Sequence, residues 1–171
     1  RGAVADSNIA IAGSGNTNVV DPAGRITVAN NGSGTSIVDH AQTGSTVNAT
    51  GSGSTVISAP LGNVTLDNSG TGTATVTGAV AGSTVATTGS GSTVISAPVG
   101  NVTLNNSGTG TATVTGAVAG STVAMTGSGS TVISAPVGDV TLANSGTGTA
   151  TVTGAVVGSI VATTGIGSAV I

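Results

Sequence analysis

The octapeptide GSTVISAP at residues 91–98 also stands at residues 53–60 and 129–136, so it recurs at a fixed interval along the chain. A shorter motif recurs at half of this interval: Gly-x-Gly pairs follow one another at a constant spacing of nineteen positions. The first glycines of the pairs are Gly13, Gly32, Gly51, Gly70, Gly89, Gly108, Gly127, Gly146 and Gly165. A fixed period of this length is typical of solenoids, in which each repeat is one coil that packs on its neighbours. The sequence therefore predicts one coil for each Gly-x-Gly pair.

Two types of coil alternate, so that the full repeat unit contains two coils. One reads GSGSTVISAPVGNVTLNNS, and the other reads GTGTATVTGAVAGSTVATT. Counted from the first glycine, position 7 is Val or Ile in every coil, and position 16 is Val or Leu from Val28 to Val161. Position 11 is Leu or Val from Leu61 to Val156. We expect these three aliphatic columns to fill the interior, and their β-branched residues favour strands.

The residues between the columns predict two strands in each coil. Residues 71–77 alternate threonine with Gly, Ala and Val, which is the period of a strand with one apolar face and one hydroxyl face. Positions 14 to 18 form the second strand, and Pro at position 10 followed by Gly or Asn predicts the turn between them. We therefore predict an all-β fold, a flattened two-sheet β-solenoid of nine 19-residue coils, with coils about 4.8 Å apart.

Composition excludes several functional classes. The chain has no aromatic residue and no cysteine, 4% of its residues are charged, and its net charge is −3. Arg1 and Arg25 are the only basic residues, whereas nucleic-acid binding requires many phosphate contacts and stacked rings. No apolar run approaches the roughly 18 residues of a membrane span. We expect no nucleic-acid partner, no membrane insertion and no cofactor.

His40 is the single histidine, and it occupies the same coil position as Asp21, one coil earlier. Stacking should bring the two side chains together, as an acid–base or metal pair or as a local hydrogen bond. A metal site needs further ligands, and a serine nucleophile needs an activating base nearby. The sequence offers neither, so we favour the local hydrogen bond and predict that the protein is not an enzyme, with no catalytic or metal-binding residues.

The chain begins and stops within a coil. Residues 1–12 match the last twelve positions of a coil, residues 13–164 make eight full coils, and residues 165–171 begin another. We expect one solenoid domain over residues 1–171, whose two half coils complete each other between copies. The residues expected at this seam are Arg1, Gly2, Ala3, Val4, Ile9, Val170 and Ile171. The alternatives are a fragment of a longer repetitive protein and a capped monomer.

Threonine rows are the remaining candidate surface. They comprise Thr71, Thr73, Thr75, Thr77, Thr109, Thr111, Thr113, Thr115, Thr147, Thr149, Thr151 and Thr153, and position 15 adds a column from Thr27 to Thr141. Such rows resemble the flat Thr-x-Thr faces of β-solenoid antifreeze proteins, in which methyl and hydroxyl groups order water against ice. Ice is therefore an alternative partner. The simpler explanation is that threonine forms good strands on a solvated face.

The coils, with strings such as GNVTLDNSG at residues 62–70, resemble the repeats of bacterial secreted β-helical adhesins of the filamentous haemagglutinin type. This resemblance implies an extracellular or cell-surface shaft or fibre, of bacterial origin. All coils have one length, without an inserted loop for recognition. We therefore expect a structural subunit of a self-assembling fibre or adhesin shaft, whose partners are copies of itself, end to end and in lateral bundles.

Overall fold

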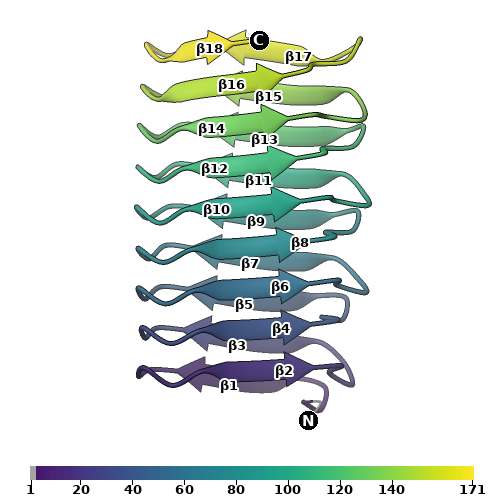
Figure 1. Ribbon diagram of the computed structural model, residues 1–171, viewed down its shortest axis with the longest axis vertical. Coiled ribbons are helices and arrows are strands. Elements are labelled where there is room, and N and C mark those ends of the chain that lie inside the picture. Colours follow the sequence, from purple (N-terminus) through teal and green to yellow (C-terminus); the bar gives the residue numbers. More distant parts are fainter. Residues whose placement is uncertain (1–2) are drawn as a thin grey trace.

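The computed structural model describes residues 3–171 and shows a stack of two-stranded coils (Figure 1). The odd-numbered strands form one nine-stranded parallel sheet, and the even-numbered strands form the other. The first sheet contains β1 (Ser7–Ile11), β3 (Ile26–Asn30), β5 (Ser45–Ala49), β7 (Val64–Asn68), β9 (Ser83–Thr87), β11 (Val102–Asn106), β13 (Ser121–Met125), β15 (Val140–Asn144) and β17 (Ile160–Thr163). The second contains β2 (Thr17–Val20), β4 (Ser36–Asp39), β6 (Thr55–Ser58), β8 (Ala74–Thr77), β10 (Thr93–Ser96), β12 (Ala112–Thr115), β14 (Thr131–Ser134), β16 (Thr149–Thr153) and β18 (Ser168–Val170).

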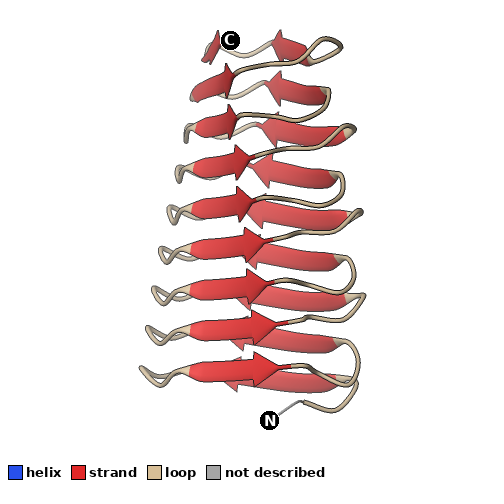
Figure 2. Cartoon of the chain, turned by 45° about the vertical axis from the view of Figure 1, so that its right-hand side comes forward, coloured by secondary structure: helices blue, strands red, loops and turns tan. Residues whose placement is uncertain are grey.

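Each strand from β3 to β16 pairs with the equivalent strand of the coil before it and with that of the coil after it. Leu66 in β7, for example, stands in register with Val47 on one side and Val85 on the other. The sheets lie face to face as two layers joined by loops (Figure 2). The predicted β-solenoid is therefore confirmed. None of residues 3–171 belongs to a helix long and apolar enough to cross a bilayer.

The core is a narrow column of small aliphatic side chains between the sheets. Positions 7 and 16 point inward as predicted, and Ile57, Leu66 and Ile95 are fully buried. Dispersion contacts and apolar burial accumulate along the whole stack without any aromatic ring. These two columns hold every coil in the same register.

The prediction that position 11 fills the interior is wrong. Leu61, Val99 and Val137 are 63%, 72% and 73% exposed, and they project from one narrow edge of the solenoid. The proline before each of them, at position 10, is buried instead. The cause lies at position 9, which adopts positive φ in every complete coil, for example 45° at Ala97. A left-handed residue turns the chain and breaks the alternation of inward and outward side chains.

The Gly-x-Gly pairs form the opposite corners of the coils. A Cβ on Gly110 would lie 1.9 Å from the carbonyl oxygen of Gly91 in the preceding coil. The corresponding Cβ on Gly15 would meet nothing within 4 Å, because no described coil precedes it. Glycine is therefore required wherever one corner stacks on another.

Candidate functional site

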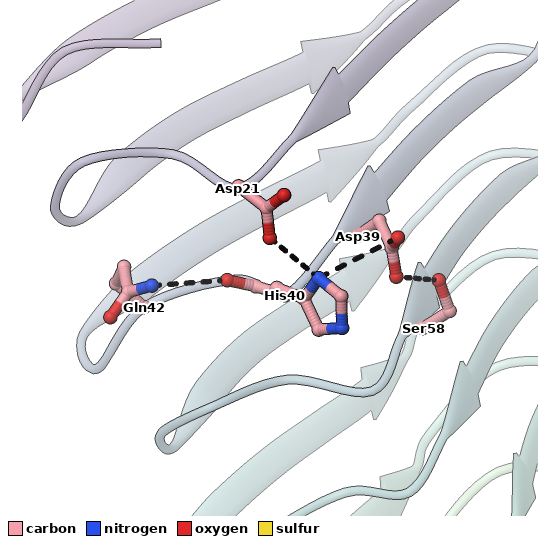
Figure 3. Close-up of polar contacts among 5 residues, drawn as sticks. All are labelled: Asp21, Asp39, His40, Gln42 and Ser58. Atoms are coloured by element: carbon pink, nitrogen blue, oxygen red, sulfur yellow. Dashed lines mark hydrogen bonds and ion pairs between the residues drawn. The ribbon is translucent and has the colours of Figure 1, made fainter. Parts of the chain in front are cut away.

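Asp21 and His40 form the one His–carboxylate contact that the sequence predicted. The His40 Nδ1 atom lies 2.7 Å from Asp21 Oδ1 and 3.7 Å from Asp39 Oδ2, at an exposed turn (Figure 3). Ser58 Oγ donates a hydrogen bond to Asp39 Oδ1 at 2.7 Å and does not contact the imidazole. The carboxylate, rather than His40, is therefore the acceptor for this hydroxyl, which fits a local hydrogen bond better than an activated nucleophile.

Two further features lie near this end of the solenoid. A depression of about 250 Å³ is lined by Asp6, Arg25 and neighbouring residues of β3 and β5. Arg25 Nε donates a hydrogen bond to Asp6 Oδ1, and this bond and the negative charge raise the pKa of the Arg25 guanidinium. Within residues 3–171, no group of three or more His, Asp, Glu or Cys side chains is placed to hold a metal ion.

The predicted threonine rows do not form a uniform array. Seven of their residues lie in even-numbered strands: Thr75, Thr77, Thr113, Thr115, Thr149, Thr151 and Thr153. The other five lie in the corners before these strands: Thr71, Thr73, Thr109, Thr111 and Thr147. Thr113 stands between Val94 and Val132 in the ladder, and Thr115 stands between Ser96 and Ser134. Threonine rows therefore alternate with rows of Ser and Val. The odd-numbered sheet differs, because its position 15 is threonine in consecutive strands. This column contains Thr27, Thr46, Thr65, Thr84, Thr103, Thr122 and Thr141, each in register with the next.

The predicted seam residues lie at the two ends of the stack, and Arg1 and Gly2 fall outside the described residues. Ile9 and Ile171 belong to the core columns at positions 16 and 7; Ile9 is half-buried, and Ile171 is 77% exposed. Ala3 packs against the core, whereas Val4 is 71% exposed on the position 11 edge and Val170 is 52% exposed on an outer face. The structure thus gives Val4 and Val170 no place in the core.

Exposed aliphatic side chains gather in the last coils. They comprise Val157, Ile160, Ile166, Val170 and Ile171. Ile160 takes the place that threonine holds in the column before it, where it pairs with Thr141. Exposed apolar residues at one end of a molecule are typical of an interaction surface.

Comparison with protein families, curated proteins and solved structures gave no match. The functional argument therefore rests on the geometry of this chain.

A buried polar network inside the solenoid was not predicted from the sequence, which was interpreted to place position 18 in the second strand without giving its asparagine a role. The Asn106 side chain points inward, and its Nδ2 donates to Gly110 O at 3.3 Å, Ser130 O at 3.1 Å and Thr131 Oγ1 at 3.2 Å. Asn30 and Asn68 make the same three contacts. The detectable signal was an asparagine in every second coil, two places after the buried residue at position 16.

This network distinguishes the two coil types. We call the coils that begin at Gly13, Gly51, Gly89 and Gly127 the Asn coils, because each ends with a buried asparagine at position 18. We call the coils that begin at Gly32, Gly70, Gly108 and Gly146 the Ser coils, because each has an inward serine at position 14. Asn coils carry the larger Val or Ile at that position, so wide and narrow layers alternate along the core.

Proposed function

We propose that this chain is a structural rod, a segment of an extracellular fibre or of the shaft of a surface adhesin, which lengthens by stacking coils end to end. The observation that carries the proposal is the unbroken register of both sheets, in which coils of equal length follow one another without an inserted loop. A rod with constant cross-section is suited to spanning distance. Recognition usually relies on loops or clefts that depart from the regular scaffold.

The ends of the rod supply the means of growth. Among the described residues, no strand pairs with the outer edges of β1 and β2 or of β17 and β18. Unpaired strand edges are templates for another chain, and a head-to-tail contact without a closing rotation produces an open filament. The core-column residues Ile9, which is half-buried, and Ile171, which is 77% exposed, would be buried by such a contact.

A bacterial, cell-surface setting is the finer form of this proposal. Its support is the resemblance of the coils to repeats of filamentous haemagglutinin-type adhesins and the nearly uncharged outer faces, with 4% charged residues in the whole chain. Faces without charge repulsion would also allow rods to pack side by side, which would give the lateral bundles expected from the sequence.

Gly15→Ala tests end-to-end growth without disturbing the core. A Cβ at Gly15 meets nothing within 4 Å in this structure, so the isolated solenoid should keep its melting temperature. In a filament, the Gly167 corner of the preceding copy would lie against Gly15. Within the chain, Gly91 lies against Gly110 in the same way, and a Cβ on Gly110 would be 1.9 Å from the Gly91 carbonyl oxygen. We expect the unsubstituted protein to form filaments whose length rises with concentration, and the variant to remain as short rods in negative-stain electron microscopy.

Ser14→Ala is the matched control, because Ser14 is exposed and lies between the two corner glycines. It should form filaments like the parent chain. Filaments of normal length from Gly15→Ala would show that growth does not use the coil ends. Single rods from the parent chain at all concentrations would overturn the stacking proposal.

Ice binding is the second candidate, and the threonine column at position 15 supports it better than the rows of the even-numbered sheet do. The unbroken threonine column of the odd-numbered sheet places equivalent hydroxyl and methyl groups at about 4.8 Å intervals, unlike the mixed even-numbered face. If this column orders water, Thr103→Lys should abolish most of the thermal hysteresis of the protein solution. Thr113→Lys, on the other face, should leave it unchanged. Absence of hysteresis in the parent chain would exclude this candidate.

A further inference from the structure

We infer that the coil ends select the type of coil that stacks on them, so that a second copy binds well only in the register that keeps Asn and Ser coils alternating. This inference rests on the end-to-end stacking proposed above. It identifies the partner as a solenoid end that presents matching polar groups to the core, and not as any free strand edge.

In three of the four Asn coils the asparagine amide contacts a threonine hydroxyl two coil starts further along the stack. Asn106 closes one Asn coil, and the hydroxyl that accepts from its Nδ2, that of Thr131, belongs to the start of the next Asn coil, 25 residues later. The intervening Ser coil has Ala112 at the equivalent position and offers no hydroxyl. The Asn106 side chain is 1% exposed, so a neighbour without this hydroxyl would remove one of the three Nδ2 contacts in a site closed to water. Asn144, which faces Ala169, keeps only the two backbone acceptors.

A second contact requires the same alternation. The backbone N–H of Val102, in an Asn coil, donates to Ser121 Oγ in the following Ser coil at 3.3 Å. Val140 and Ser159 repeat the contact at 3.2 Å. Another Asn coil in that place would present Val or Ile, which has no acceptor, and would leave the buried N–H unpaired. Two independent hydrogen bonds therefore specify a two-coil period.

The half coils of this chain are out of phase with each other. Residues 1–12 match the end of a Ser coil, whereas residues 165–171 begin an Asn coil in which Ala169 replaces the threonine of position 5. Suppose that Ile171 of one copy is followed directly by Arg1 of the next. Thr163 of the first copy then stands 25 places before Thr17 of the second, at the place where the pattern requires asparagine. Such a seam can still pair its backbones, but it lacks the amide contact.

One additional coil length would bring the seam into phase. A copy of residues 96–114 placed after Ile171 completes the Asn coil and adds the start of a Ser coil. The copied Asn106 then stands 25 places before Thr17 of the next molecule, and the copied Val102 stands one coil before Ser7. Both hydrogen bonds that define the internal register would be available at the seam.

The experiment compares three chains: the parent, the chain extended by residues 96–114, and a chain extended by residues 96–133. The last is longer still, but it ends in the start of an Asn coil and is out of phase again. Filament growth is followed by light scattering and electron microscopy over a concentration series. We expect the in-phase chain to assemble at a concentration at least about tenfold lower than both others, since one or two buried hydrogen bonds separate the seams.

Thr17→Val provides the residue-level check. Thr17 Oγ1 has no hydrogen-bond partner within the described structure that the substitution would remove, so folding should be unaffected. In the in-phase chain the substitution should raise the assembly concentration severalfold, and in the parent chain it should have no effect. Equal assembly of all three chains, or assembly that improves steadily with length, would overturn coil-type selection while leaving end stacking intact. Absence of filaments from all three would refute the stacking itself, and the inference with it.

Discussion

Replacing Ile133 by aspartate is expected to destabilise the solenoid by about 4 kcal/mol or more, because it buries a carboxylate among aliphatic side chains. Ile133 is fully buried in β14 and stands in register between Val114 and Val152 of the same column. No basic side chain lies in this column to pair with the charge. Thermal unfolding at low protein concentration, followed by far-UV circular dichroism, measures the loss.

Val132→Asp is the matched control on the same strand, because Val132 points outward and is half-buried. Its effect should stay within about 1 kcal/mol. Since each coil contacts mainly the coils next to it, the damage from Ile133→Asp should also be local. Hydrogen exchange should accelerate most in β12, β14 and β16. An unchanged melting temperature would mean that position 7 is not a core column.

Replacing Gly110 by alanine is the second large expected effect, and it arises from backbone contact alone. The added methyl group would lie 1.9 Å from Gly91 O and 2.9 Å from Gly91 C, and neither atom can move without shifting its coil. Separating the two coils breaks adjacent ladder hydrogen bonds. We expect a loss of about 3 kcal/mol or more, measured by the same thermal unfolding.

Gly15→Ala introduces the same methyl group at the same coil position without a neighbour within 4 Å. This variant should melt at or slightly above the temperature of the parent chain, because alanine loses less conformational entropy than glycine on folding. If Gly110→Ala were as stable as Gly15→Ala, the corners would not be closely stacked.

The fold could be predicted from the sequence because one short period governs it. Nine Gly-x-Gly pairs at a constant spacing define the coil, and the invariant aliphatic residues at positions 7 and 16 define its inward faces. The neighbour relation of Asp21 and His40 followed from the same spacing, and the structure confirms it with a 2.7 Å contact. Repetition converts a distance along the chain into a contact in space, which an ordinary globular sequence does not do.

The direction of side chains beyond a turn could not be predicted in the same way. Alternation holds within a strand, but the left-handed residue at position 9 resets it, so Val99 points outward and Pro98 points inward. Asn106 escaped notice for a related reason, because asparagine before Ser-Gly is also a turn signal. Its inward direction depends on acceptors from two later coils, Gly110 O and Thr131 Oγ1.

The sequence by itself thus determined the coil length, the parallel register and two of the core columns, because these follow from periodicity and local strand geometry. Only the tertiary structure decided which turn residues point into the core. It also decided that buried hydrogen bonds join the two coil types. Turn conformation and the satisfaction of buried polar groups depend on several coils packed together, and no single repeat contains that information.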